Sequence, residues 1–205
     1  MKKYENITAF ILAGGLSSRM RTNKALLQFG GKSLIQIFID LLDSLFVEVK
    51  ISSNELQLFQ FTSKKIIKDL IPGRGPLGGI HSALNFTTSH RNFIISCDMP
   101  FIHKELINYL CNYKSEKDII VPKADGRIQP LCGIYSKKIL SEVELLLVES
   151  QDKNKGLKGS IYELISRVNA EIIDVTKMKF YHPDLFFNIN TPDDYLYANK
   201  ILEQK

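Results

Sequence analysis

The sequence predicts a three-layer α/β fold with a mostly parallel central sheet, formed by one domain over residues 1–205. Two observations lead to this class. Short apolar runs alternate with amphipathic stretches along the chain, which is the pattern of parallel strands joined by helices. A length of 205 residues supports one well-buried core and leaves little room for a second domain. In such a sheet, ligands bind in the loops that follow the carboxyl ends of the strands.

The first predicted strand leads directly into a glycine-rich loop. Thr8–Leu12 is a continuous apolar run, the kind of strand that is buried on both faces of a parallel sheet. The loop Ala13–Lys24 follows, and then Leu34, Phe38 and Leu41 recur at helical spacing. The remaining elements of this half are strands at Phe46–Ser52, Lys65–Lys68 and Asn92–Ser96, a loop at Pro72–Gly79, and a helix from the end of that loop to about Phe86.

The second half of the chain continues the alternation. Helices are predicted at His103–Tyr113 and Lys137–Val148, because apolar residues recur there at helical spacing. The closing helix Pro192–Leu202 has proline in its first turn, where proline is well tolerated. The strands predicted in this half are Asp118–Val121, Gly133–Tyr135 and Glu171–Val175, and Phe186–Ile189 is a short apolar segment.

Composition and spacing exclude several classes of protein. No apolar run approaches the roughly 20 residues that cross a membrane, and Ile7–Leu12 is too short for a signal peptide, so the chain is expected in the cytosol. Cys97, Cys111 and Cys132 form no C-x-x-C pair, which argues against a disulfide framework or a zinc cluster. The net charge of +5 suits either a well-solvated surface or the attraction of anionic substrates. Because the chain lacks a long basic run, nucleic acid is not expected as a partner.

The segment Leu12–Lys24 has the composition of a triphosphate-binding loop. Gly14 and Gly15 allow the backbone to approach a ligand and to point amide groups at anionic oxygens. Arg19 and Lys24 add the fixed positive charge that a triphosphate requires. The loop matches neither the Walker pattern nor G-x-G-x-x-G. A plain strand–helix turn with surface cations is the structural alternative.

Asp98 follows the predicted strand Asn92–Ser96 almost directly. A carboxylate at the carboxyl edge of a parallel sheet, facing a phosphate loop, is a suitable ligand for Mg²⁺. A magnesium ion there would bridge phosphate oxygens and offset the charge that repels an incoming phosphate. The alternative is that Asp98 caps the helix that follows.

Two later segments complete the candidate site. The glycine- and proline-rich segment Asp69–Ile80 is either a tight turn before a helix or a loop that closes over a nucleotide. Near the end of the chain, Thr191 is a good N-cap and Pro192 suits the first turn of a helix. Capping does not explain why Asn188 and Asn190 alternate on a strand, where both side chains would share one face and could bind a polar ligand.

Taken in order, these motifs resemble the molybdenum cofactor guanylyltransferase family. The segments that carry the resemblance are L-A-G-G-x-S-x-R-M with K-A-L-L, then D-x-x-P-G-x-G-P-L-G-G, C-D-M-P, Q-P-L-C-G-I-Y and N-I-N-T-P-D-D. They cover nearly the whole chain. The resemblance implies a GT-A-like Rossmannoid nucleotidyltransferase fold. It also implies transfer of GMP from GTP to the terminal phosphate of molybdenum-molybdopterin, with release of pyrophosphate.

The resemblance assigns roles to individual residues. It implies that Lys24, Arg19 and Asp98 are catalytic, and that Asp98 holds Mg²⁺. Asn54 is a further GTP candidate, with Ser52 as the alternative match. The residues that it places at GTP are Leu12, Ala13, Gly14, Lys24, Asp69 and Asp98. The residues that it places at molybdopterin are Arg19, Asn188 and Asn190. Further partners that it implies are cofactor-insertion proteins or the molybdoenzymes themselves.

The chain departs from the family pattern at two positions of the first loop. Arg21 stands where the family usually has glycine, and Asn23 stands where it commonly has aspartate. Arg21 adds bulk and charge, and Asn23 removes a carboxylate next to Lys24. Three other functions remain open: cytidylyl transfer from CTP to molybdopterin, guanylyl transfer to a small phosphorylated acceptor, and non-catalytic binding of GTP.

Overall fold

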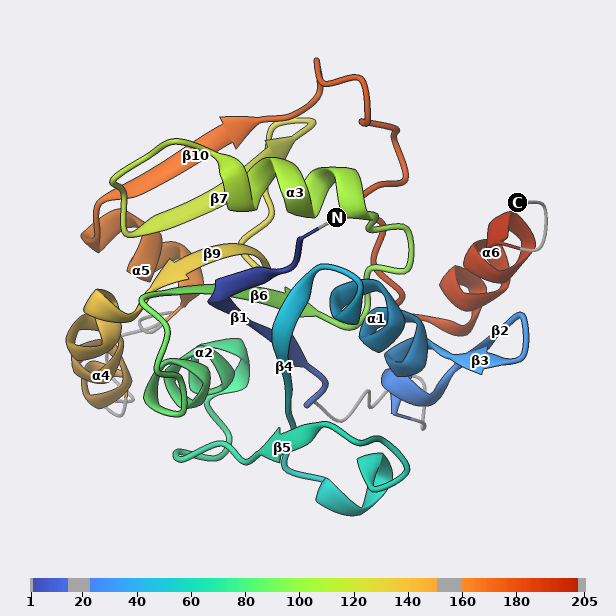
Figure 1. Cartoon of the computed structure of the whole chain (residues 1–205), viewed down its shortest axis with the longest axis horizontal. Helices are drawn as coiled ribbons and strands as arrows, with labels where there is room; N and C mark the ends of the chain where they lie inside the picture. Colours follow the sequence, from blue (N-terminus) through green and yellow to red (C-terminus); the bar gives the residue numbers. More distant parts are fainter. Residues whose placement is uncertain (1, 15–22, 151–159, 203–205) are drawn as a thin grey trace.

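The computed structural model describes residues 2–14, 23–150 and 160–202. A central sheet runs in the order β10-β7-β9-β6-β1-β4-β5, with the short β8 paired to β7 (Figure 1). Its strands are β1 (Tyr4–Leu12), β4 (Phe46–Ser52), β5 (Lys65–Ile67), β6 (Arg91–Ser96), β7 (Ile119–Ala124), β8 (Arg127–Ile128), β9 (Cys132–Ser136) and β10 (Ala170–Asp174). Most neighbours are parallel, and β9 runs antiparallel to both β6 and β7.

Helices cover both faces of the sheet, with α1 and α3 on one side and α2, α4 and α5 on the other (Figure 1). The helices are α1 (Leu34–Asp43), α2 (Gly75–Asn85), α3 (Lys104–Asn112), α4 (Leu140–Glu149), α5 (Ile161–Arg167) and α6 (Pro192–Leu202). Short 3-10 turns are η1 (Lys24–Leu26), η2 (Leu56–Phe59) and η3 (Lys137–Ile139), and β2 (Gln28–Phe29) forms a hairpin with β3 (Lys32–Ser33). No helix within the described ranges is long and apolar enough to cross a membrane.

Strand β1 divides its side chains between the two cores. Ile7, Ala9 and Ile11 pack into the core under α1 and α3, and Phe10 and Leu12 pack into the core under α2 and α4. Successive side chains of a strand point to opposite faces, so a strand that is apolar throughout must be covered on both sides. The predicted three-layer fold with a mostly parallel sheet is therefore confirmed.

Four neighbouring parallel strands, β6, β1, β4 and β5, end in register. Leu12 pairs with Ser52 on one side and with Ser96 on the other, and Ser52 pairs with Ile67. The loops that follow β1, β4, β5 and β6 therefore leave the sheet at one common edge. This alignment brings the predicted site segments together.

Helix α2 begins earlier than the sequence predicts. The pattern of Pro72–Gly79 predicts a loop throughout, but the helix starts at Gly75. Pro76 lies in its first turn, where no backbone donor is lost. Gly79 packs closely against Leu12, since a Cβ added to this glycine would lie 3.2 Å from Leu12 Cδ2. The glycines therefore serve close packing of a helix on the sheet, in addition to shaping a turn.

The prediction that Asn188 and Asn190 alternate on a strand is wrong. The chain is irregular at both positions. Asn188 Nδ2 instead donates to the carbonyl oxygen of Phe186, two residues earlier, at 2.8 Å. Local side-chain bonds of this kind compete with the ladder of a sheet.

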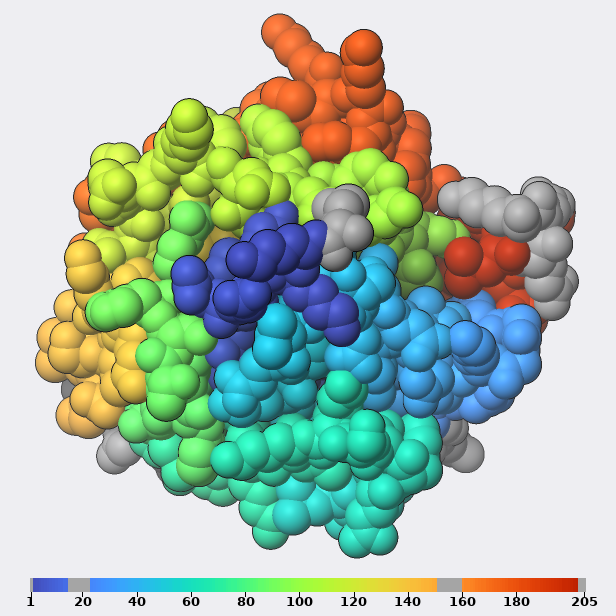
Figure 2. Space-filling view, in the orientation of Figure 1, coloured from blue at the N-terminus to red at the C-terminus, as the bar shows by residue number. Residues whose placement is uncertain are grey.

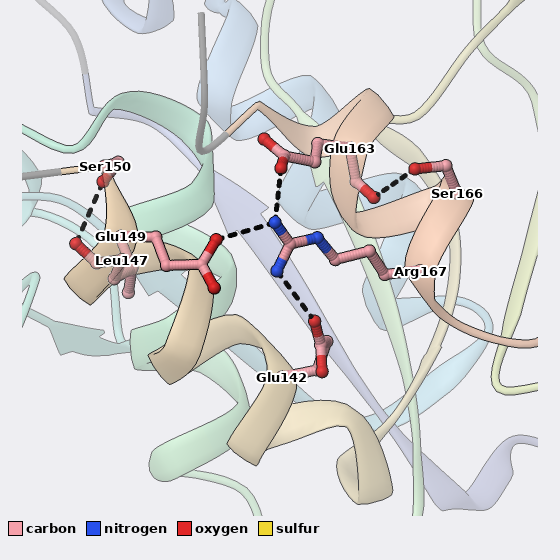
Figure 3. A network of polar contacts seen from close by, with 7 residues as sticks. All are labelled: Glu142, Leu147, Glu149, Ser150, Glu163, Ser166 and Arg167. Carbon is pink, nitrogen blue, oxygen red and sulfur yellow. Dashed lines mark hydrogen bonds and ion pairs between the residues drawn. The ribbon is translucent and has the colours of Figure 1, made fainter. Parts of the chain in front are cut away.

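Two contacts hold the carboxyl-terminal elements in place. Helix α6 lies beside the β2–β3 hairpin (Figure 2), where Tyr195 donates to the carbonyl oxygen of Gln28 at 2.8 Å. Arg167 of α5 contacts Glu142 and Glu149 of α4, as well as Glu163 on its own helix (Figure 3). This network attaches the short α5 to α4.

Candidate functional site

A cavity of about 570 Å³ lies at the common carboxyl edge of β1, β4, β5 and β6. We call it the first cavity. Four of the residues expected at a nucleotide line it, namely Leu12, Gly14, Asn54 and Asp69. Further lining residues that the motifs did not single out are Ser53, Glu55 and Ser96, which close or follow β4 and β6. Leu131, from the segment before β9, also lines the cavity, and its carbonyl oxygen accepts from the Ser96 N–H at 2.9 Å.

Glycines form one wall of the first cavity. Gly73 and Gly75 adopt φ of 77° and 55°, which side chains other than glycine rarely tolerate. Both line the cavity, next to Pro76 at the start of α2. The turn and the helix start therefore expose backbone to a ligand without side chains in the way.

Asp69 is held at the rim of the first cavity by residues at the carboxyl end of β4 and just after it. Asn54 Nδ2 donates to Asp69 Oδ2 at 2.8 Å, and Asn54 Oδ1 accepts from the Asp69 backbone N–H at 3.0 Å. Ser52 Oγ donates to Asp69 Oδ1 at 3.4 Å. Both candidates for the asparagine position, Asn54 and Ser52, therefore lie at the cavity and contact Asp69.

Lys24, Asp98 and Asn190 form a second group, which we call the reactive cluster. Lys24 Nζ donates to Asn190 Oδ1 at 2.8 Å and lies 3.7 Å from Asp98 Oδ2. The Asp98 carbonyl oxygen accepts from the Ile189 N–H at 2.9 Å, which ties the two distant segments together. The cluster joins the first loop, the end of β6 and the segment before α6.

One carboxylate oxygen of Asp98 has no hydrogen-bond partner in the described part of the chain. This oxygen, Oδ1, is buried. Helix α3 begins at Lys104 with His103 at its N-cap, so Asp98 does not cap it. A buried carboxylate oxygen without a donor is well suited to a hard cation. No group of three or more His, Cys, Asp or Glu residues with metal-binding geometry occurs among the described residues.

These features fit magnesium. Mg²⁺ is commonly bound by one or two carboxylates, with substrate phosphates and waters completing its coordination. Asp98 would supply one such carboxylate, with Lys24 Nζ 3.7 Å from its Oδ2. A dedicated cage of protein ligands is not required.

The start of α6 fixes Asn190. Asp194 Oδ2 accepts from the backbone N–H groups of Asn190 and Thr191 at 2.8 Å each, and Thr191 Oγ1 accepts from the Asp194 N–H at 3.2 Å. This is a reciprocal capping arrangement. Burial alone would raise the pKa of Asp194, but the hydrogen bonds from Asn190 and Thr191 outweigh it and hold the pKa below its usual value.

A second cavity of about 400 Å³ adjoins the first, and Pro76 and Leu131 line both. Its walls are mainly apolar, with Arg74, Gln129 and Asn188 among the polar side chains. The first turn of α5 also contributes, so the Arg167 network helps to place this wall. Asn188 thus lies in the second cavity, whereas Asn190 belongs to the reactive cluster.

Ala13, which was expected at GTP, does not line either of these cavities. It is buried, and its N–H donates to the Ser52 carbonyl oxygen at 2.9 Å, so its role in the structure is to continue the sheet edge. Arg19, the other expected member of the first loop, lies outside the described residues, as do Gly15 and Arg21.

Cys97 lies next to Asp98 but does not supply a nucleophile. Its thiol is buried, and burial raises its pKa to about 12. A thiol is nucleophilic as the thiolate, which is scarce at neutral pH for such a group. The site therefore offers charge and positioning, without a covalent intermediate on this cysteine.

Comparison with known proteins points to one family. The model of the MobA-like NTP transferase domain matches residues 9–168. A probable molybdenum cofactor guanylyltransferase of Clostridium perfringens is 39% identical over 92% of this chain and 93% of its own. Another of that description, from Carboxydothermus hydrogenoformans, is 32% identical over 98% of this chain and 99% of its own.

Two solved structures have a similar fold. Molybdopterin-guanine dinucleotide biosynthesis protein A from Archaeoglobus fulgidus superimposes with a TM-score of 0.82 and 26% identity, covering 97% of this chain and 100% of its own. A 4-diphosphocytidyl-2C-methyl-D-erythritol synthase from Anaerococcus prevotii has a TM-score of 0.69 at 15% identity, covering 97% and 96%. The second likeness supports the fold alone.

Proposed function

The chain belongs to the MobA-like NTP transferase domain family, and we propose that it transfers GMP from GTP to the terminal phosphate of molybdenum-molybdopterin. The product is a guanine dinucleotide form of the cofactor, and pyrophosphate is released. The observation that carries the proposal is the reactive cluster of Lys24, Asp98 and Asn190, which lies at the same sheet edge as two adjoining cavities. A transferase needs such an arrangement, because donor and acceptor must meet at one phosphate.

The first cavity suits the donor. Its volume and glycine wall admit a nucleoside, and Leu12 and Gly14 at the end of β1 line it. Asp69 offers carboxylate oxygens at the rim. Guanine presents neighbouring N–H donors that match a carboxylate, whereas cytosine presents a single amino group. This difference supports GTP over CTP.

The second cavity suits the acceptor. A pterin is a flat heterocycle with hydrogen-bonding edges, and the cavity combines apolar walls with the carboxamides of Gln129 and Asn188. Arg74 adds a cation, hydrogen-bonded to Ser150 at 3.4 Å. Because Pro76 and Leu131 border both cavities, an acceptor placed here would have its phosphate near the donor.

The reaction is an in-line displacement. An oxygen of the acceptor phosphate forms a bond to the α-phosphorus of GTP as the bond to the pyrophosphate oxygen breaks. The acceptor is already ionised at neutral pH, so no general base is needed. Lys24 and, by the family pattern, Arg19 bind the phosphates and hold them in line. When bound at Asp98, Mg²⁺ would neutralise charge that builds up on the phosphates.

The direct test is pyrophosphate release with each of GTP, CTP, ATP and UTP, with and without molybdenum-molybdopterin, in the presence of Mg²⁺. Release is expected with GTP only, and only when the acceptor is present. Release with CTP in place of GTP would identify a cytidylyltransferase. Tight GTP binding with no release, whichever acceptor is supplied, would contradict an enzymatic role.

A further inference from the structure

Lys24 is preceded by a residue that bridges two loops of the site. Asn23 Nδ2 donates to Glu55 Oε2 at 2.8 Å, and Asn23 Oδ1 accepts from the Ala25 N–H at 3.0 Å. Both ends of the carboxamide are therefore used. The two contacts fix its orientation, because a flipped amide would place its oxygen against the Glu55 carboxylate.

Each end of this amide serves a different loop. The oxygen caps η1, the turn that begins with Lys24, and Ala25 anchors that turn as a fully buried residue. The nitrogen reaches Glu55, which lines the first cavity. The backbone N–H of Glu55 in turn donates to Ser53 Oγ at 3.1 Å. The contact thus connects the Lys24 turn with the loop that follows β4.

We propose that the Asn23–Glu55 hydrogen bond is the positioning contact that sets Lys24 against Asp98 and Asn190. This inference rests on the proposed function. Glu55 need not touch the reacting atoms, since it acts through Asn23 on the turn that carries Lys24. Asparagine is required at position 23 because its partner is a carboxylate. Aspartate there would place two acceptors 2.8 Å apart and drive the loops away from each other.

The departure from the family pattern at position 23 is explained by this pair. A carboxamide can donate to Glu55 and still cap η1, whereas a carboxylate can only do the second. Exchanging the two side-chain types between positions 23 and 55 is expected to keep the contact. Aspartate at position 23 becomes acceptable when residue 55 is glutamine, because the glutamine amide then donates in the opposite direction.

The test is a double-mutant cycle in the full-length chain, with Asn23→Asp, Glu55→Gln and the double variant. The kcat for pyrophosphate release from GTP and the Kd for GTP are measured for each. Asn23→Asp is expected to lower kcat by about a hundredfold, with a much smaller effect on Kd, because a small displacement of a catalytic cation has that scale of cost. Glu55→Gln keeps a side-chain oxygen that can accept from Asn23, so the kcat of this variant is the reference against which the double variant is compared.

The kcat of the double variant is the decisive measurement for the positioning role. Recovery of kcat to within about tenfold of the wild type supports the positioning role, because a purely local loss at Asn23 would not be repaired from Glu55. A double variant no better than Asn23→Asp, or an Asn23→Asp variant as active as the wild type, would overturn it. Asp40→Asn is the control, since Asp40 is in an ion pair with Lys32 on the exposed side of α1.

The wild type in the same assay keeps the two proposals apart. Failure of the wild type to turn over GTP would count against the proposed function. In that case the thermal unfolding midpoints of the wild type, the two single variants and the double variant test the contact. Coupling between positions 23 and 55, with the double variant more stable than Asn23→Asp, supports the contact, and independent effects overturn it.

Discussion

Asp98 is fixed through its backbone, and its carboxylate is held only in part. Its carbonyl oxygen is bound by the Ile189 N–H, one carboxylate oxygen lies near Lys24, and the other is buried without a partner in the described chain. A buried acceptor in this state is unfavourable in the absence of a cation. The arrangement is therefore better suited to binding a metal than to stabilising the fold.

Replacement of Asp98 by alanine should separate chemistry from binding. We expect kcat to fall by about a hundredfold to a thousandfold, which is typical when one electrostatic stabiliser of a transition state is removed. The Kd for GTP should change by much less, because the first cavity keeps its lining. Steady-state rates and calorimetry on the Asp98→Ala variant, with Asp40→Ala as the control, measure the two effects. Equal losses in rate and in binding would argue against the metal role.

Single residues could be predicted from the sequence only where a motif marks them. Lys24, Asp69 and Asp98 stand in such motifs, and the structure places them at one sheet edge. Glu55 could not be predicted, because its importance arises from a contact with Asn23, which lies far away along the chain. The division of Asn188 and Asn190 between a cavity and the reactive cluster depends on the local backbone, which alternation along a strand predicts wrongly.

At the start of α6, Asp194 both caps the helix and fixes a residue of the reactive cluster. Asp194 binds the N–H groups of Asn190 and Thr191, so its ionised form fixes both the helix start and the partner of Lys24. Its pKa in the folded chain lies below the ordinary value of 3.8. The ionised form is therefore favoured by folding.

This shift predicts how stability depends on pH. Because the folded pKa is the lower one, Asp194 contributes stability at pH values above 3.8, and that contribution is lost as the pH falls through the folded pKa. Urea unfolding of the wild type and of Asp194→Asn at a series of pH values tests it. The difference between the two proteins should shrink on acidification. A difference that stays constant down to the acid limit would contradict the assignment.

The close approach of β7 and β9 requires glycine at position 133. A Cβ added to Gly133 would lie 2.5 Å from the carbonyl oxygen of Ile120 and 2.7 Å from Val121 Cγ1. Gly133→Ala should therefore lower the free energy of unfolding by about 1–3 kcal/mol or more, because backbone must move to relieve the overlap. Urea denaturation measures this change.

Gly14→Ala is the matched control. The nearest atoms to a Cβ at Gly14 are 3.9 Å away, in ordinary van der Waals contact. Its unfolding midpoint should remain close to that of the wild type, even if ligand binding changes. Equal destabilisation by both variants would show that the close approach of β7 and β9 is not the cause.

Strands and helices with a continuous hydrophobic pattern could be predicted well. The bounds of β4 and α6 are those predicted, and β1 extends only further toward the amino terminus than expected. The two-residue strands β2, β3 and β8 were not predicted, because so few residues carry no periodicity. Helix α5 was missed for a similar reason, since it is short and depends on the Arg167 contacts with α4.

The fold of the whole molecule brings four segments that are distant in the sequence, the loops after β1, β4, β5 and β6, to one edge of the sheet. The alternation of strands and helices was enough to predict the layers and the site edge. The antiparallel direction of β9 could not be predicted, because a strand's direction depends on how the chain returns to the sheet. The second cavity could not be predicted either, since it forms where α2, α5 and the segment before β9 meet.

The most direct test of guanylyl transfer measures where a labelled phosphorus atom of GTP is found after the reaction. GTP labelled at its α-phosphorus, or in a parallel reaction at its γ-phosphorus, is incubated with the protein, Mg²⁺ and molybdenum-molybdopterin, and the products are separated. The α-label is expected in the dinucleotide form of the cofactor and the γ-label in pyrophosphate. A γ-label on the acceptor, or an α-label that stays in free nucleotide, would contradict guanylyl transfer.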